Sequence, residues 1–254
     1  MVKDLKVLSI FARLECGKKL DIKGFLDISF VDWDGKISSV LFLPSCNFRC
    51  PFCHNVNLVL YHEKMETIPF EYIENQLENQ KSWADGVCIT GGEPTLHNNL
   101  PELCSRIKKM GFMVKLDTNG TNPAMLEDLM NQKLVDFVAM DIKAPLTKEK
   151  YSIATGVNVE KLLENVKKSV QFLMESGIDY EFRTTVVPSI HSLEDIKQIC
   201  HSLKDCRKYV LQKFDVGIGK IVLDPEFMSK SLSEEEMKDF LAAAQEVIPY
   251  AKCR

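Results

Sequence analysis

The sequence predicts an α/β protein built on a parallel sheet whose strands are joined by helices. Short runs rich in β-branched and aromatic residues alternate with amphipathic stretches about six times along the 254 residues, which is typical of parallel strands with helical crossovers. Hydrophobic residues make up 45% of the chain and charged residues 27%, enough for a sizeable core. Periodicity alone leaves open whether the sheet closes into a barrel or stays doubly wound.

A β-hairpin is expected at the start of this pattern. Residues 24–43 carry two strand-like runs around a turn at DWDGK, and the second arm runs over Ile37–Leu43. The later strands are expected at 86–90, 112–117, 136–143, 180–187 and 209–214.

Helices are expected between these strands. One begins near Pro69 and places Phe70, Ile73 and Leu77 on one face. The others are expected at 99–110, 123–132, 159–176, 192–204 and 233–247. Ser233 and Glu236 stand at the spacing of a capping box, which marks the start of the last helix.

Charge and hydropathy argue against two classes of partner. A net charge of −4 gives no electrostatic reason to expect nucleic acid or an anionic membrane. Apolar runs such as VLFLP at 40–44 are far shorter than the roughly 18 residues of a membrane span. The first residues lack a clear secretory signal, so the nine cysteines indicate reduced thiols plus a metal site in a cytoplasmic protein.

Three cysteines lie together in the stretch CNFRCPFCHN, directly after the strand at 37–43. Cys46, Cys50 and Cys53 have three and then two residues between them, and active sites of parallel barrels form in the loops after the strands. Such a loop can hold three corners of an iron–sulfur cluster and leave one iron open. A zinc ion completed by His54 or His62 is the alternative.

The other six cysteines have no partner at the C-x2-C spacing. We interpret them as buried apolar thiols; they are Cys16, Cys88, Cys104, Cys200, Cys206 and Cys253.

Polar groups also follow the later strands. In CITGGEPTL, Gly91 and Gly92 would let a ligand approach the backbone, and Glu93 could bind an ammonium group. Charged residues that share a strand face are Lys115 and Asp117, Asp141 and Lys143, and Glu181 and Arg183, joined by Thr185. Buried charges are costly unless paired, so the pattern favours a pocket for a zwitterionic ligand, with an internal salt-bridge network as the alternative.

These motifs together resemble the radical S-adenosylmethionine superfamily. The family motif C-x3-C-x-aromatic-C is matched by Cys46, Cys50, Phe52 and Cys53, and GGE is matched at 91–93. The resemblance implies a partial (β/α)6 TIM-like barrel with an N-terminal β-hairpin. It also implies a [4Fe–4S] cluster on the three cysteines and S-adenosylmethionine bound at the open iron.

The resemblance also assigns roles in cofactor binding. Phe52 would lie by the adenine, and the backbone of Gly91 and Gly92 would contact the methionyl amine. Glu93 belongs to the same GGE motif.

The order of CNFRCPFCHN, GGEPTL, LDTNG, MDIKAP and RTTVVP is similar, more narrowly, to activating enzymes of glycyl-radical enzymes, above all the group serving anaerobic ribonucleoside-triphosphate reductase. This likeness covers about residues 22–250. It implies that Asp117, Thr118, Asp141 and Lys143 surround the S-adenosylmethionine carboxylate, with Arg183 as a further candidate. A monovalent cation is expected near Asp117 and Asp141.

The implied activity is reductive cleavage of S-adenosylmethionine to a 5′-deoxyadenosyl radical, which takes hydrogen from a glycine of a partner enzyme. A flavodoxin- or ferredoxin-type protein would supply the electron, and no catalytic residue is needed beyond the cluster and the cofactor. One alternative is the same chemistry on a small molecule or another peptide. A second is a zinc or iron–sulfur electron-transfer module without catalysis.

The likeness implies one barrel domain over residues 22–254, preceded by an extension, 1–21, of unknown role. Residues 54–90 contain one cysteine, Cys88, so the ferredoxin-like insert of some activating enzymes is absent and one cluster is expected. DVGIGK at 215–220 lacks the full glycine pattern of a nucleotide-binding loop and is expected to be an ordinary loop.

Overall fold

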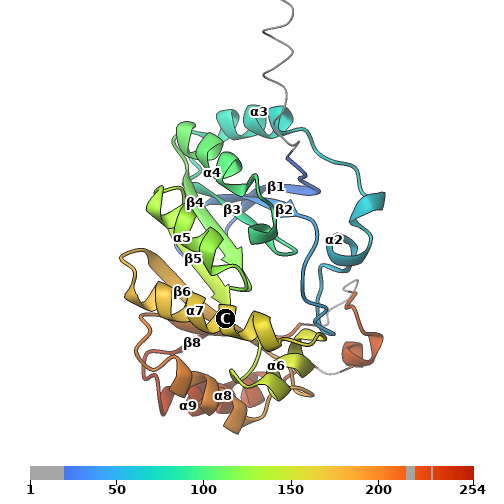
Figure 1. The fold of residues 1–254 in the computed structure, drawn as a ribbon, viewed down its shortest axis with the longest axis vertical. Coiled ribbons are helices and arrows are strands. Elements are labelled where there is room, and N and C mark those ends of the chain that lie inside the picture. The colour runs from blue at the N-terminus through green and yellow to red at the C-terminus, as the bar shows by residue number, and fades with distance from the viewer. Residues whose placement is uncertain (1–19, 216–220, 230) are drawn as a thin grey trace, which may run out of the picture.

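The computed structural model describes residues 20–215, 221–229 and 231–254. One eight-stranded sheet runs through them, with the strands side by side in chain order (Figure 1). Most of the predicted 1–21 extension and most of the DVGIGK loop lie outside the described residues.

The sheet begins with the predicted hairpin and continues with parallel strands. β1 (Gly24–Ser29) pairs antiparallel with β2 (Ser38–Leu43). The strands that follow, each parallel to its neighbour, are β3 (Gly86–Gly91), β4 (Met113–Thr118), β5 (Phe137–Asp141), β6 (Asp179–Val186), β7 (Tyr209–Lys213) and β8 (Lys252–Cys253).

At least one helix follows each of the strands β2 to β7. The helices are α2 (Val56–Leu60), α3 (Phe70–Gln80), α4 (Leu100–Lys109), α5 (Pro123–Asn131), α6 (Lys148–Thr155), α7 (Glu160–Glu175), α8 (Leu193–Ser202) and α9 (Glu234–Gln245). Figure 1 shows α3, α4, α5, α7, α8 and α9 along the outer side of the curved sheet, with α2 apart from them. Six strand–helix units behind an N-terminal hairpin form a partial TIM-like barrel, and the predicted fold is confirmed.

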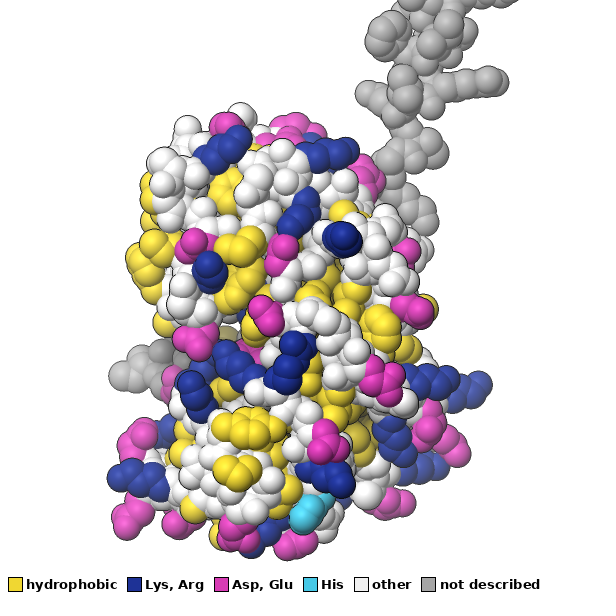
Figure 2. Space-filling view, turned by 90° about the vertical axis from the view of Figure 1, so that its left-hand side faces the viewer, with side chains coloured by type: hydrophobic (Ala, Val, Ile, Leu, Met, Phe, Trp, Pro, Cys, Tyr) yellow, Lys and Arg dark blue, Asp and Glu magenta, His cyan; other side chains and the backbone are white. Residues whose placement is uncertain are grey.

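The core forms because the strands are covered on both faces. In β5, Val138, Ala139 and Met140 are all fully buried, as expected for an interior parallel strand. α7 contributes one apolar face, with Val166 and Leu173 buried beneath it. Pro69 occupies the N-cap position of α3, and the capping box predicted for α9 is present. On the face shown in Figure 2, acidic and basic side chains are interspersed.

The hairpin turn closes the end of the sheet at which the parallel strands begin. Trp33 in this turn is 6% exposed, and its ring lies 5.9 Å from that of Phe137 at the start of β5. Beside it, the buried carboxylate of Glu181 pairs with Lys208 at 3.0 Å and with Arg254 at 3.0 Å. This end of the barrel is therefore sealed by side chains from both ends of the described chain.

Three elements were not predicted: α2, α6 and β8. α6 matters for the site because it ends at Gly156, which has φ of +67°. A Cβ at this position would lie 2.2 Å from the carbonyl oxygen of Arg49, so the close approach of the cysteine loop requires glycine.

The interpretation of the other cysteines is mostly confirmed. Cys88, Cys104, Cys200 and Cys206 are buried, whereas Cys253 is exposed at the edge strand β8, so the interpretation is wrong for Cys253. Cys16 lies outside the described residues. Across the described ranges, no helix has the length and apolar character that crossing a membrane would require.

Candidate active site

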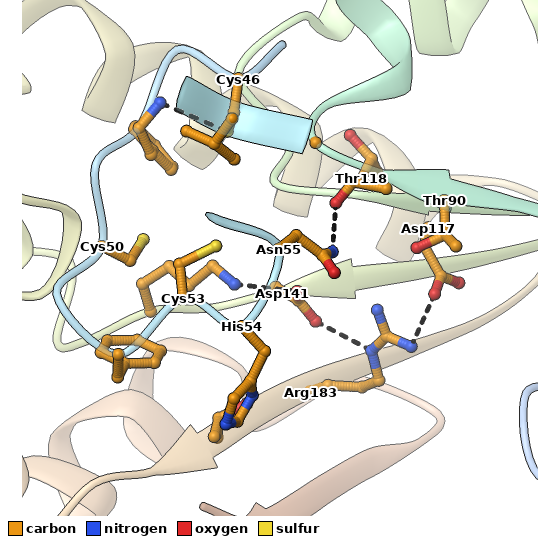
Figure 3. A pocket seen from close by; sticks show the side chains of 17 residues that line it. Cys46, Cys50, Cys53, His54, Asn55, Thr90, Asp117, Thr118, Asp141 and Arg183 are labelled. Atoms are coloured by element: carbon orange, nitrogen blue, oxygen red, sulfur yellow. Dashed lines mark hydrogen bonds and ion pairs between the residues drawn. The ribbon is translucent and has the colours of Figure 1, made fainter. Parts of the chain in front are cut away.

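A cavity of about 260 Å³ opens at the carboxyl ends of the strands. The three cysteines of the loop after β2 lie on one side of it, and charged side chains from β4, β5 and β6 lie on the other (Figure 3). The predicted site residues that line it are Cys46, Cys50, Phe52, Cys53, Gly91, Gly92, Asp117, Thr118, Asp141, Lys143 and Arg183. Glu93 is the one predicted site residue that does not line the cavity.

Several lining residues were not assigned to cofactor binding from the sequence. They are Phe48, His54, Asn55, Val59, Thr90 and Thr185. Thr90 directly precedes the paired glycines, and Asn55 lies two residues after the last cysteine. Their position next to these motifs is the sequence feature that could have identified them as lining residues.

The cysteine loop is held in place by a segment far along the chain. The backbone N–H of Leu223 donates to the carbonyl of Cys53 at 3.1 Å, and that of Asp224 donates to the carbonyl of Pro51 at 2.8 Å. Because these bonds use the main chain, they fix the loop independently of its side chains.

The paired glycines fix the start of that loop. Gly91 has φ of +119°, and a Cβ there would lie 2.3 Å from the carbonyl oxygen of Leu43. A Cβ on Gly92 would lie 1.9 Å from the carbonyl oxygen of Ser45. Both glycines line the cavity as predicted, but the close contact that requires them is with the end of β2 and its loop.

Glu93 lies behind the cavity wall. It is 1% exposed, and its carboxylate accepts hydrogen bonds from the Thr95 N–H at 3.1 Å, the Thr118 hydroxyl at 2.7 Å and the Asn119 N–H at 2.6 Å. Burial raises its pKa despite these bonds. Glu93 therefore ties the end of β3 to the end of β4, where it orients Thr118 and Asn119.

Five charged side chains form a continuous chain across three strands. Lys115, which is fully buried, contacts Asp117. Arg183 Nη1 lies 3.2 Å from Asp117 Oδ2, and Arg183 Nε lies 2.8 Å from Asp141 Oδ1. Lys143 Nζ lies 2.9 Å from Asp141 Oδ2. The strand faces predicted for these residues are confirmed.

Four members of this chain line the cavity, two acidic and two cationic, while Lys115 does not line it. Burial opposes ionisation of both aspartates. The positive charges of Arg183 and Lys115 nevertheless lower the pKa of Asp117, and those of Arg183 and Lys143 lower the pKa of Asp141. The carboxylates in turn raise the pKa of Lys143 and of Arg183 against the effect of burial. Asp117, Asp141, Lys143 and Arg183 are therefore charged at neutral pH, and the cavity wall offers one ammonium and one guanidinium group that can pair with a ligand carboxylate.

The arrangement bears on the expected monovalent cation. All four oxygens of Asp117 and Asp141 already have cationic partners in Lys115, Arg183 and Lys143. A small cation at this position would have to displace one of these groups or share its oxygen.

Neither histidine considered for a zinc site completes one. The His54 ring stacks on Phe214 at 5.4 Å between centroids, and its Nε2 donates to the Asp215 carbonyl at 2.8 Å. His62 Nε2 lies 3.2 Å from the Ser45 hydroxyl. Within the described residues, no three His, Cys, Asp or Glu side chains converge on one metal ion.

The donor set of the loop instead suits a cluster. In a cubane cluster each thiolate binds a different iron, so three thiols that share a cavity without converging on one point fit that group. Burial raises the pKa of Cys46 to about 11 and of Cys50 to about 12. Cluster binding must therefore release the thiol protons.

Comparison with known families decides between a zinc site and an iron–sulfur cluster. The family profile described as "Radical SAM superfamily" matches residues 40–219. The chain belongs to the radical S-adenosylmethionine superfamily. Membership implies a [4Fe–4S] cluster and S-adenosylmethionine as cofactors, for which the three-thiol loop and the charged cavity provide a fitting site.

Two curated relatives align with most of this radical S-adenosylmethionine protein. A protein of Methanocaldococcus jannaschii named "Putative glycyl-radical enzyme activating enzyme" is 35% identical over 229 residues, covering 89% of this chain and 92% of its own. A protein of Methanococcus aeolicus named "Probable GTP 3′,8-cyclase" is 28% identical over 214 residues, covering 78% and 68%.

A solved structure supports the fold. Streptococcus suis SuiB bound to S-adenosylmethionine aligns with a TM-score of 0.63 at 14% identity and covers 85% of this chain. The chain spans about half the length of SuiB (51%), and at this identity the likeness shows the fold alone.

Proposed function

We propose that the protein cleaves S-adenosylmethionine reductively and installs a radical on a glycine of a partner enzyme. The observation that supports it most is one cavity that joins a three-thiol loop to a charge chain presenting Lys143 and Arg183. The similarity to the protein named "Putative glycyl-radical enzyme activating enzyme", over 92% of that protein's length, points the same way. When bound, the cluster supplies the electron that releases the 5′-deoxyadenosyl radical from S-adenosylmethionine.

In this proposal each side of the cavity has a distinct task. Cys46, Cys50 and Cys53 hold three irons, while Lys143 and Arg183 receive the carboxylate of S-adenosylmethionine. Asp117 and Asp141 keep those cations charged and in place. The peptide groups of Gly91 and Gly92 would contact the amine, with Thr118 nearby and Glu93 fixing Thr118 from behind.

Phe52 would border the adenine. Its ring is 6% exposed and packs edge-on against Phe214 at 6.2 Å, so it is already oriented before any ligand binds. No side chain needs to act as a general acid or base in this scheme, because the cavity only binds, orients and excludes water.

The remaining expectations form part of the same proposal. Residues 22–254 act as one barrel domain in the cytoplasm, a flavodoxin- or ferredoxin-type protein supplies electrons, and anaerobic ribonucleotide reductase is the first partner to test. A monovalent cation near Asp117 and Asp141 also stays a prediction. Replacing potassium and sodium by choline would slow the reaction if such a cation competes successfully with the paired groups.

The test is an anaerobic assay of the reconstituted, reduced protein with S-adenosylmethionine. 5′-Deoxyadenosine is quantified for the wild type, for Cys50→Ala and for the control Cys104→Ala, whose thiol is buried in α4 away from the cavity. We expect production to be lost only in Cys50→Ala. A wild-type protein that holds a reducible cluster yet produces no 5′-deoxyadenosine would contradict the proposal and favour electron transfer.

A second candidate is radical chemistry on a small molecule. The relative named as a GTP cyclase, at 28% identity, is the observation that favours it. Activation of a glycyl-radical enzyme predicts a radical signal on the partner protein after mixing, whereas a small-molecule reaction predicts a new low-mass product and no protein radical.

A further inference from the structure

Three polar side chains form a closed ring beside the first cysteine: Asn47, Asn119 and Thr121. Asn47 directly follows Cys46, while Asn119 and Thr121 belong to the loop between β4 and α5 and are 5% and 4% exposed. The Thr121 hydroxyl accepts from Asn47 Nδ2 at 2.8 Å and donates to Asn119 Oδ1 at 2.7 Å. Asn119 Nδ2 closes the ring by donating to Asn47 Oδ1 at 2.9 Å.

The ring fixes which way the Asn119 amide faces. Its oxygen receives two donors, the Thr121 hydroxyl at 2.7 Å and the Thr121 N–H at 3.0 Å, so the nitrogen cannot take that place. One of the two amide hydrogens goes to Asn47, and the other is directed at Cys46 Sγ across 3.9 Å. Glu93 holds the backbone of Asn119 through a hydrogen bond of 2.6 Å.

We propose that Asn119 is a positioning residue that stabilises the reduced state of the cluster by donating a hydrogen bond to Cys46 Sγ. A cluster thiolate becomes more electron-rich on reduction, and N–H donors to the sulfurs are among the factors that set cluster potentials. The backbone N–H of Phe48, 3.4 Å from the same sulfur, is a donor that no side-chain substitution removes. The inference rests on the family's cluster and not on the identity of the partner enzyme.

The test is a spectroscopically monitored redox titration of the reconstituted protein without S-adenosylmethionine. In Asn119→Ala we expect the reduction equilibrium constant to fall about tenfold, which for a one-electron couple lowers the midpoint by about 59 mV. The control is Asn165→Ala, which removes an amide that donates to the Thr121 carbonyl at 2.9 Å and so supports the same loop without contacting sulfur. We expect its midpoint to stay at the wild-type value.

Two results would overturn the inference: an unchanged midpoint in Asn119→Ala at full iron content, or an equal shift in Asn165→Ala. If Asn119→Ala fails to retain its cluster, Asn119→Leu replaces it, because leucine fills a similar volume but has no N–H to donate to Cys46 Sγ. A wild-type midpoint in that variant counts equally against the inference. Failure of the partner assay leaves these potentials unaffected, so the two proposals are tested separately.

Discussion

The two ends of the barrel both bury charge, yet only one end has the properties of a site. At the carboxyl ends, the chain from Lys115 to Lys143 borders a cavity and presents Lys143 and Arg183 to it. At the opposite end, Glu181 is more buried than Asp117 or Asp141 and pairs with Lys208, but the turn containing Trp33 covers that end. Buried ion pairs alone therefore do not mark a site; an unfilled space beside them does.

Removal of the central cation should have the largest effect. Arg183→Met leaves Asp117 and Asp141 buried with one lysine each, which we expect to destabilise the protein by about 3–5 kcal/mol and to abolish S-adenosylmethionine binding. Anaerobic urea denaturation and equilibrium dialysis measure both effects. The control Lys148→Met loses only an exposed ion pair with Glu160 at 3.3 Å, and we expect a loss of about 1 kcal/mol or less. A wild-type urea midpoint in Arg183→Met would refute the charge-chain argument.

At the sealed end, Trp33→Ala should separate stability from binding. Loss of a buried indole against Phe137 is expected to cost about 3–5 kcal/mol. We expect the dissociation constant for S-adenosylmethionine to stay unchanged under conditions where the variant is folded. A weakened affinity at full folding would show that the two ends are coupled.

Lys143 offers a smaller and more selective change. Lys143→Met removes one cation from the cavity while Asp141 keeps Arg183, so we expect about 2–3 kcal/mol of lost binding, roughly 30- to 150-fold in Kd, with a minor effect on folding. Lys208→Met is the matched change at the other end and should lower stability without altering Kd. Equal effects of the two variants on Kd would contradict the distinction.

The smallest expected effect concerns pH. His191 Nδ1 accepts from the Val187 N–H at 3.0 Å, and its Nε2–H donates to the Lys143 carbonyl at 2.9 Å. Burial lowers its pKa, while the nearby Asp195 is itself paired with Lys150 at 2.9 Å. The unfolded chain therefore takes up a proton first as pH falls, and stability conferred by neutral His191 is lost below about pH 6.5.

The check is the urea midpoint measured between about pH 7.5 and about pH 5.5. His191→Gln should be less stable than the wild type at the upper pH and should change less across the range. An identical pH dependence in the two proteins would exclude His191 as the source.

Sequence periodicity was sufficient for the strands and the long helices because their buried faces repeat clearly. It failed for α2 and α6, which span 5 and 8 residues, and for the two-residue β8. These elements are too short to show a period, and contacts with distant segments hold them: Gly156 at the end of α6 lies against Arg49.

For the site, motif and strand position located the cavity residues, but not how they pair. Nothing in the sequence shows that Arg183 lies between Asp117 and Asp141, because that depends on the side-by-side order of three strands. Glu93 stands beside lining residues in sequence, yet its carboxylate turns to Asn119. Asn119 itself was missed because its contact with Cys46 joins two loops separated along the chain.

The hydrogen bonds from Leu223 and Asp224 to the cysteine loop have a consequence for how the protein matures. During synthesis the cysteines emerge early, whereas the segment that fixes their loop is translated near the end. A nascent chain that has exposed only the first half of the barrel therefore presents thiols without their final geometry. The native geometry of the cysteine loop therefore requires a chain translated past Asp224, and we expect cluster loading to be a late step in biogenesis.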